Sequence, residues 1–305
     1  MTEAMKENLV IVGSGPAGLS AAIYAKQAGF NPLVLRAIEP SLISTTDRVN
    51  NFIGLGDIGG VELYSAMYAH YKEICGDDRS AHFEVATVFR NIDGTFELQS
   101  TTGNTITAKS VIWAAGAKPR KLGLHEEESF EAISYCATCD GSFYEGDPHL
   151  IVVGGGDSAV EESLYLAELV DKVTLLVRND LRAKEELQER LRANSKVEVV
   201  LGAQISEVAE TGNMEVSVKI DGSDDLIVSG IFVAIGHVPN SHPIGSVVVL
   251  DSSGFVGTVD ETSGFFVAGD INGSNHRQAI IAAGDGARAG IEASNFLRSS
   301  VNLVS

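Results

Sequence analysis

The sequence contains little cysteine, few basic residues and no long apolar run, and each scarcity excludes a class of protein. Three cysteines in 305 residues are too few for a disulfide scaffold. No segment approaches the roughly 20 consecutive apolar residues that a membrane-spanning helix needs. Lysine and arginine total 22 against 41 aspartates and glutamates, so the formal charge is −19. This acidity argues against general binding of nucleic acid or of anionic membranes, and it favours solubility.

The composition is that of a globular protein large enough for two domains. Apolar residues make up 44% of the chain and charged residues 21%, which is typical of folded rather than disordered proteins. The first eight residues, MTEAMKEN, are polar and of mixed charge, so they lack the pattern of a secretory signal. We therefore expect a cytoplasmic location.

A glycine-rich motif near the N-terminus joins a predicted strand to a predicted helix. It follows the apolar run of residues 9–12 and precedes an alanine-rich helix pattern that extends to about Ala28, after which PLVLRA predicts a second strand. The G-x-G-x-x-G positions are Gly13, Gly15 and Gly18. The first glycine permits the turn, the second lets a pyrophosphate approach the backbone, and the third lets helix and strand pack closely. Amides at the start of the helix would face the phosphates.

The same design recurs about 140 residues later. There Gly154, Gly156 and Ala159 hold the motif positions, with Ser158 beside them, and a helix pattern and the strand pattern KVTLLV follow. One such motif is weak evidence, but two motifs in complete strand–turn–helix–strand settings indicate two dinucleotide sites.

Each half of the sequence also contains a predicted β-hairpin that returns into a strand. The turns fall at Gly103-Asn104 in the first half and at Asp221-Gly222 in the second. The last segment, from GFFVAGD onward, predicts a strand, a Gly-Asp loop and a long apolar helix.

Cys136 and Cys139 form a C-x-x-C pair in the segment CATCDG. A zinc site would need two further soft ligands, yet the only other cysteine is Cys75, and the seven histidines form no H-x-x-x-H motif. A structural disulfide that closes so small a loop would stabilise little. The residues therefore favour a reversible dithiol/disulfide pair over both alternatives, and we expect no metal. Cys75 ends an apolar-periodic segment and is expected to be a buried, unreactive thiol.

The order and spacing of these motifs resemble the low-molecular-weight thioredoxin reductases, a branch of the pyridine-nucleotide disulfide oxidoreductases. The resemblance rests on VGSGPAG, CATCDG, GGGDSAVEE and AGDINGSNHRQAIIAAGDGARA, and it covers nearly the whole chain. It implies an α/β fold of two Rossmann-like dinucleotide-binding domains, each with a β-hairpin or β-meander insertion, the second domain being inserted into the first. The implied FAD domain comprises residues 1–117 and 246–305, and the implied NAD(P)H domain, residues 118–245, carries the dithiol.

The resemblance also implies roles for individual residues. Cys136 would be the outward nucleophile, Cys139 the thiol that exchanges electrons with FAD, and Asp140 the acid/base carboxylate. The alternative for Asp140 is a turn residue before Gly141. The implied FAD-binding residues are Gly13, Gly15, Gly18, Asn51, Asp270, Arg277, Gln278 and Ala279, of which the last five otherwise have ordinary loop and N-cap roles. The implied NADPH-binding residues are Gly154, Gly156, Ser158, Ala159, Arg178 and Arg182.

Two stretches depart from the family pattern, both on the side where electrons enter. The family's His-Arg-Arg, which clasps the 2′-phosphate of NADPH, corresponds here to Val177, Arg178 and Asn179, followed by Arg182. The family's Gly-Gly-Gln-Leu corresponds to PSLI, residues 40–43. The dithiol itself is intact.

The leading hypothesis is an enzyme that carries electrons from NADPH through FAD and the dithiol to a protein disulfide such as that of thioredoxin. An alternative keeps the flavin and dithiol but has a degenerate nicotinamide site, which would use NADH or no nicotinamide, with reduced ferredoxin as donor or with a different acceptor. A third hypothesis is a non-catalytic flavin/dithiol redox sensor. The resemblance further implies a homodimer, and an inserted domain that rotates about residues 116–118 and 237–240 so that dithiol and nicotinamide reach the flavin in turn.

Overall fold

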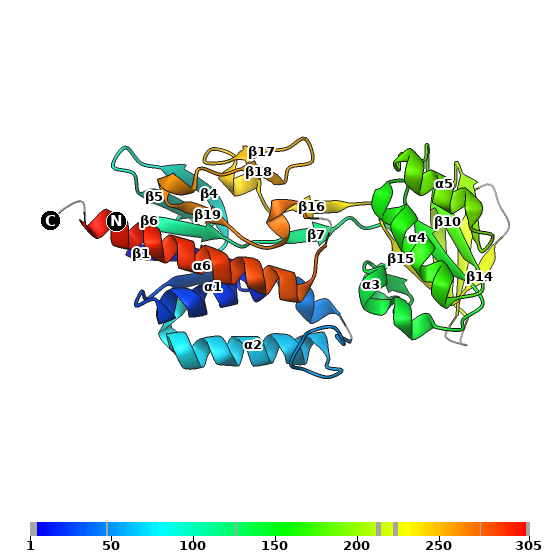
Figure 1. The fold of residues 1–305 in the computed structure, drawn as a ribbon, viewed down its shortest axis with the longest axis horizontal. Coiled ribbons are helices and arrows are strands. Elements are labelled where there is room, and N and C mark those ends of the chain that lie inside the picture. Colours follow the sequence, from blue (N-terminus) through cyan, green and yellow to red (C-terminus); the bar gives the residue numbers. More distant parts are fainter. Residues whose placement is uncertain are drawn as a thin grey trace. The chain divides into compact units, whose positions relative to one another are not determined.

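The computed structural model describes residues 5–46, 48–125, 127–211, 215–221, 225–274 and 276–302. The chain forms two compact units (Figure 1). The first unit combines Met1–Lys118 with Val238–Ser305, and the second is Pro119–His237. The second unit is therefore an insertion within the first.

The first unit is built on a mixed sheet. Its strands are β1 (Met5–Val12), β2 (Leu33–Arg36), β3 (Ser80–His82), β4 (Val85–Arg90), β5 (Phe96–Ser100), β6 (Thr105–Trp113), β17 (Val249–Leu250), β18 (Val256–Thr258) and β19 (Phe265–Val267). Its helices are α1 (Pro16–Gln27), α2 (Gly60–Cys75) and α6 (Ala279–Asn302), with 3-10 turns at Leu42–Thr45, Asp77–Arg79, His242–Ile244, Glu261–Ser263 and Asp270–Asn272. The main sheet has the order β3-β2-β1-β6-β5-β4, with β19 beside β6, and β17 pairs with β18. Strands β4 and β5 form the antiparallel part of the main sheet.

The second half of strand β1, residues 9–12, is buried on both faces of this sheet. On β1, Leu9 and Ile11 pack against α1 and α6, whereas Val10 and Val12 belong to the core on the opposite face. Successive side chains of a strand point to opposite faces, so a strand covered on both sides is an uninterrupted apolar run. This explains why the sequence shows no polar alternation over residues 9–12.

Helices α1 and α6 lie side by side (Figure 1) because small residues line their contact. A Cβ atom at Gly286 would lie 2.0 Å from the carbonyl oxygen of Ala17, and one at Gly290 would lie 2.5 Å from that of Ala21. Such distances leave no room for a side chain, so the glycines of α6 and the alanines of α1 allow the two backbones to approach closely.

The second unit repeats the design with its own sheet. Its strands are β8 (Ile133–Ser134), β9 (Leu150–Val153), β10 (Val173–Val177), β11 (Val197–Leu201), β12 (Ile205–Glu210), β13 (Val216–Ile220), β14 (Leu226–Val228) and β15 (Gly230–Val233). Its helices are α3 (Ala137–Asp140), α4 (Asp157–Leu169) and α5 (Glu185–Ala193), with 3-10 turns at Glu127–Ser129 and Gly141–Tyr144. A parallel sheet of order β11-β10-β9-β15-β8 accompanies an antiparallel meander, β12-β13-β14.

The two connections between the units run as a pair of short strands. Strands β7 (Ala117–Pro119) and β16 (His237–Pro239) form a two-stranded sheet. The amide of Asn240 donates to the carbonyl of Gly116 at 3.0 Å, and the amide of Arg120 donates to that of Gly236 at 2.9 Å. Both glycines have positive φ, 67° and 95°, a conformation that favours glycine.

The predicted fold class is confirmed: two parallel-sheet units, one inserted into the other, each carrying an antiparallel meander. Strands β5 and β6 pair across residues 101–104, so the turn predicted at Gly103-Asn104 is confirmed as well. Strands β13 and β14 also pair antiparallel, although Gly222 of the turn predicted there lies outside the described residues. Cys75 is the last residue of α2 and is 4% exposed, and burial raises the pKa of its thiol to about 11, as expected for an unreactive cysteine. Among the described residues, no helix is both long enough and apolar enough to cross a bilayer.

Candidate active site

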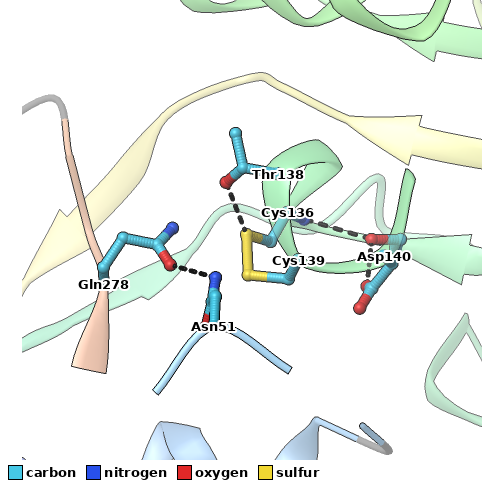
Figure 2. The surroundings of a disulfide bond; sticks show 7 residues. Asn51, Cys136, Thr138, Cys139, Asp140 and Gln278 are labelled. Atoms are coloured by element: carbon cyan, nitrogen blue, oxygen red, sulfur yellow. Dashed lines mark hydrogen bonds between the residues drawn. A yellow bond between two sulfur atoms is a disulfide. The ribbon is translucent and has the colours of Figure 1, made fainter. Parts of the chain in front are cut away.

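The two cysteines of the C-x-x-C pair are joined by a disulfide (Figure 2). Their Cα atoms lie 5.3 Å apart on a single helical turn, α3, that begins directly after Cys136. The amides of Cys139 and Asp140 both donate to the carbonyl oxygen of Cys136, at 3.1 and 3.0 Å. Residues three apart on a helical turn share a face, so the local backbone alone holds the two sulfurs within bonding reach. Both cysteines are partly exposed, as exchange with another disulfide requires.

A buried serine links the dithiol turn to the carboxylate beside it. The hydroxyl of Ser134, at the end of β8, donates to Oδ2 of Asp140 at 2.6 Å and accepts from the amide of Cys136 at 3.1 Å. Ser134 is 6% exposed. Because a short bond from a buried hydroxyl to a carboxylate is directional and strong, Ser134 contributes to positioning the carboxylate of Asp140. The hydroxyl of Thr138 lies 3.4 Å from the sulfur of Cys136 (Figure 2).

The dithiol turn packs closely on α4. A Cβ atom at Gly141 would lie 2.9 Å from side-chain atoms of both Tyr165 and Leu166, so a larger residue here would have to displace them. Tyr144 follows in the next turn, with its ring edge-on to Phe232 at a centroid distance of 5.4 Å. Burial, together with the negative charge of nearby Asp140, raises the pKa of Tyr144 to about 12, so its phenol stays protonated at neutral pH.

A second carboxylate, that of the buried Glu127, forms hydrogen bonds with the segment that leads to the dithiol. Glu127 is 5% exposed and accepts hydrogen bonds from the hydroxyl of Tyr135 and from three successive amides, those of Leu122, Gly123 and Leu124. Burial by itself would raise the pKa of Glu127, but these four donors outweigh it and hold the pKa below its usual value. Through Glu127, the backbone of residues 122–124 is therefore linked to Tyr135, the residue that precedes Cys136.

The first glycine turn lies at the carboxyl ends of β1 and β2. A Cβ atom at Gly13 would lie 2.2 Å from the carbonyl oxygen of Ala114, and one at Gly18 would lie 1.9 Å from that of Gly13. Both positions exclude a side chain. Gly15, which precedes α1, has the hydroxyl of Ser41 3.2 Å from where its Cβ would be. The backbone at Gly15 therefore borders the loop of residues 40–43, which is one of the two stretches that depart from the pattern of the family that the sequence resembles.

Polar groups from distant parts of the first unit gather near the start of α6. The side-chain amide of Asn51 donates to Oε1 of Gln278 at 3.0 Å (Figure 2), across 227 residues of sequence. Asp270 lies in the turn after β19, and its burial raises the pKa of its carboxyl. The guanidinium of Arg277 lies 5.2 Å from the ring centre of Phe255, and its buried Nε has no hydrogen-bond partner among the described residues. Ala279 is the first residue of α6.

The second glycine turn, between β9 and α4, is covered by the segment after β10. A Cβ atom at Gly154 would lie 2.3 Å from the carbonyl oxygen of Ala234 and 2.7 Å from the Cβ of Ala159, which again excludes a side chain. The amide of Arg182 donates to the carbonyl of Gly155 at 2.6 Å. Gly156 is the residue directly before α4.

The same segment is also tied to the start of α4. The amide of Lys184 donates to Asp157 at 2.8 Å, and the charged groups of these two residues pair at 3.2 Å. Residues 182–184 therefore fold over this turn, next to Ser158 in the first turn of α4.

The residues at the family's phosphate-binding positions are divided between core and surface. Val177, the last residue of β10, is 1% exposed and packs in the core, so it offers nothing to a ligand. Arg178, Asn179 and Arg182 are exposed beside the second glycine turn. Two guanidiniums therefore remain available for a phosphate.

These features fit the binding of two dinucleotides. Glycine turns that exclude Cβ atoms let a phosphate approach the backbone closely. The first unit adds the half-buried carboxylate of Asp270 and the Nε of Arg277, which has no partner among the described residues. Among the described residues there is no cluster of His, Cys, Asp or Glu suited to a metal. Fold and site together define a dinucleotide-dependent disulfide oxidoreductase.

The chain belongs to the pyridine nucleotide-disulphide oxidoreductase family, whose model matches residues 7–290. It is 37% identical to the thioredoxin reductase of Rickettsia conorii over 307 residues, which cover 95% of this chain and 97% of that protein. It is 35% identical to the thioredoxin reductase of Bacillus subtilis over 303 residues, covering 95% and 94%. The crystal structure of thioredoxin reductase from Streptococcus pyogenes matches with a TM-score of 0.87 at 32% identity, covering 97% of this chain and all of that one. The chain is accordingly an enzyme of the flavin- and nicotinamide-dependent disulfide reductases.

Sequence reasoning did not single out Ser134, Glu127 or Tyr135. Ser134 and Tyr135 directly precede Cys136, and a serine two residues before a backbone amide is a recurrent local hydrogen-bonding arrangement that could have indicated the bond. No comparable signal marks Glu127, because the loop conformation that aims three amides at one carboxylate is a product of the folded unit.

Proposed function

We propose that this enzyme passes electrons from NADPH through FAD and the Cys136–Cys139 dithiol to the disulfide of a thioredoxin-like protein. The observation that carries the proposal is the disulfide on the α3 turn, in a chain that also holds two glycine turns shaped for dinucleotides. The similarity to thioredoxin reductases over nearly the whole chain supports the acceptor.

The first unit would hold FAD and the second NADPH. The proposed FAD-binding residues are Gly13, Gly15, Gly18, Asn51, Asp270, Arg277, Gln278 and Ala279. A bound flavin supplies two-electron exchange with both a hydride donor and a thiol. Within this set, the bond between Asn51 and Gln278 orients two amides, and the half-buried carboxylate of Asp270 can accept a hydrogen bond from a ligand hydroxyl.

The proposed NADPH-binding residues are Gly154, Gly156, Ser158, Ala159, Arg178 and Arg182. Arg178 and Arg182 would pair with the 2′-phosphate, and this supports NADPH over NADH. Since Val177 points into the core and Asn179 is neutral, we expect weaker selectivity than a full arginine cluster would give. The same departure favours a second candidate, the same relay supplied by another donor such as reduced ferredoxin.

The dithiol would transfer two electrons by thiol–disulfide exchange. The thiolate of Cys136 attacks one sulfur of the partner disulfide, so a mixed disulfide forms and the other partner sulfur leaves as a thiolate that takes up a proton. The thiolate of Cys139 then attacks Cys136, which restores the enzyme disulfide and releases the second partner thiol. Asp140, held by Ser134, exchanges the proton at its carboxylate.

Three further features of the proposal rest on the resemblance. The second unit would rotate about the paired connections β7 and β16, where the positive φ of Gly116 and Gly236 suits a hinge. The enzyme would be a homodimer, which light scattering tests by molar mass. A cytoplasmic location remains a prediction, which fractionation of the source cells tests.

Anaerobic titration of the purified yellow protein tests the function. NADPH, NADH and reduced ferredoxin are added in parallel, and bleaching of the flavin absorbance is followed. We expect NADPH to bleach the flavin within seconds and to support reduction of thioredoxin. If only ferredoxin bleaches it, the second candidate replaces the first; if no donor yields turnover with any disulfide, the protein is a redox sensor. A preparation that stays colourless with added FAD would contradict all three.

A further inference from the structure

The end of β2 carries a cation where dinucleotide-binding sheets usually carry an acid. In such sheets an Asp or Glu about 20 residues beyond the first glycine bonds to the ribose of the adenosine. Here β2 ends in Leu35 and Arg36, and the first carboxylate after it, Glu39, pairs with Lys118. The position that ordinarily accepts hydrogen bonds from the ribose therefore offers only donors.

Arg36 lies next to the first glycine turn. Strands β1 and β2 are parallel, with Val12 opposite Leu35, and the amide of Gly13 donates to the carbonyl of Leu35 at 2.9 Å. Arg36 is the following residue on β2. It is therefore at the carboxyl edge of the sheet, the edge at which parallel sheets bind ligands.

The guanidinium of Arg36 lies over an aromatic ring and has no hydrogen-bond acceptor among the described residues. Its guanidinium carbon lies 5.4 Å from the ring centre of Tyr68. Its Nε is buried without a hydrogen-bond partner, and among the described residues none forms an ion pair or hydrogen bond with its guanidinium. Nε is one of the five donors of the guanidinium, and leaving this donor buried and unmet is costly unless a ligand meets it.

An aromatic row joins Arg36 to the glycine turn. Tyr68 stacks on Tyr64, with ring centres 6.0 Å apart and planes inclined by 17°. The hydroxyl of Tyr64 lies 3.3 Å from that of Ser14, within the glycine turn itself. One edge of the unit therefore runs from the phosphate-facing turn through two tyrosines to the arginine.

We propose that Arg36 binds the adenosine end of the dinucleotide at the first glycine turn, where it donates to acceptor atoms of the ribose, the adenine or the adjacent phosphate. Arg36 is thus a specificity-determining residue that selects FAD over FMN, which lacks the adenosine monophosphate part. The inference rests on the proposed assignment of FAD to this site.

The test compares two flavins on the full-length protein. Samples loaded with FAD or with FMN are diluted, and release is followed by flavin fluorescence, which gives a dissociation constant for each. Arg36→Ala is expected to weaken FAD binding on the order of tenfold, the size of one charge-assisted hydrogen bond, and to leave FMN binding within about twofold. Arg36→Lys keeps the charge and should recover part of the loss.

Arg298 provides a matched control. Its guanidinium also lies over a ring, 5.8 Å from the centre of Phe30, and donates to the carbonyl of Ala28 at 2.6 Å, in the same unit. Arg298→Ala loses a comparable stacking contact away from the end of β2, so its affinity for FAD should equal that of the unmodified protein.

The outcomes separate the inference from the function on which it rests. An Arg36→Ala protein that loses FAD and FMN equally, or that loses neither, refutes the role of Arg36 while the proposed function stands. Failure of the unmodified protein to bind FAD refutes the proposed function itself. If Arg36→Ala does not fold, the rise in melting temperature produced by FAD relative to FMN is compared in Arg36→Lys and the unmodified protein, and an unchanged difference refutes the inference.

Discussion

Replacement of Ser134 by alanine tests whether the dithiol depends on a positioned carboxylate. The change removes one hydroxyl that donates to Asp140 at 2.6 Å and accepts from the amide of Cys136 at 3.1 Å. No charge is altered and the residue is nearly fully buried, so the change is confined to this link.

The structure sets the size of the effect. A hydrogen bond to a charged group contributes roughly 1.5–3 kcal/mol. Asp140 is partly exposed, so water replaces part of the lost bond and the lower end applies. We expect the free energy of unfolding to fall by about 1.5 kcal/mol, and the rate of disulfide exchange to fall on the order of tenfold, because about 1.4 kcal/mol in a barrier corresponds to a factor of ten.

The assay isolates the dithiol from electron input. Enzyme reduced beforehand with excess dithiothreitol, then freed of it, is mixed with oxidised thioredoxin in a stopped-flow instrument, and the exchange rate is measured from pH 6 to 9. Ser163→Ala is the control, since Ser163 is a fully buried serine of the same unit that donates only to the carbonyl of Ala159, at 2.7 Å. The control should lose stability but keep its rate and pH profile. An equal loss of rate in both variants, or none in Ser134→Ala, would refute the reasoning.

Three further predictions concern the outer thiol, the donor site and the loop that precedes the dithiol. Cys136→Ser should abolish reduction of thioredoxin yet leave bleaching of the flavin by NADPH intact, which anaerobic absorbance shows; residual turnover near the original level would contradict its role as nucleophile. Arg178→Ala and Arg182→Ala should each weaken NADPH binding on the order of tenfold without affecting NADH, as measured by titration calorimetry, and equal losses for both nucleotides would argue against a 2′-phosphate site. The lowered pKa of Glu127 means that its hydrogen bonds stabilise the fold above the ordinary carboxyl value of 4.5, and that this contribution is lost as the pH falls through the lower folded-state value. Tyr135→Phe removes one of the four donors, so urea unfolding at pH 7 and pH 3 should show a smaller difference in stability than in the unmodified protein; an unchanged difference would assign the shift to the backbone amides alone.

The strongest sequence-based predictions concerned local backbone requirements. The turns at Gly13 and Gly154 were predictable because a chain that bends sharply between a buried strand and a helix leaves no room for a Cβ atom, and both turns have that geometry. The disulfide between Cys136 and Cys139 could equally be predicted, since a spacing of three residues places two sulfurs on one face of a helical turn. The apolar run before each glycine turn marked a strand buried on both faces.

Contacts between segments far apart in the chain could not be predicted from the sequence. The bond between Asn51 and Gln278 spans 227 residues, and nothing in either neighbourhood predicts it without the resemblance to a family. The sequence showed that Val177 stands where the family has a histidine, but only the burial of its side chain shows that this side chain cannot reach a ligand. Arg36 can be read from the sequence. That its guanidinium lies over Tyr68 and has no acceptor among the described residues depends on how α2 packs against the end of β2.

By itself, then, the sequence determined the two glycine turns and the C-x-x-C pair, because each follows from the conformations available to a few adjacent residues. The insertion of one domain into the other was expected only from the resemblance to a family. The tertiary structure alone decided which side chains face one another across the sheet edge, and which polar atoms are left without a partner. The physical reason is that hydrogen bonding and burial depend on neighbours in space, and most neighbours at these sites are supplied by packing rather than by adjacency along the chain.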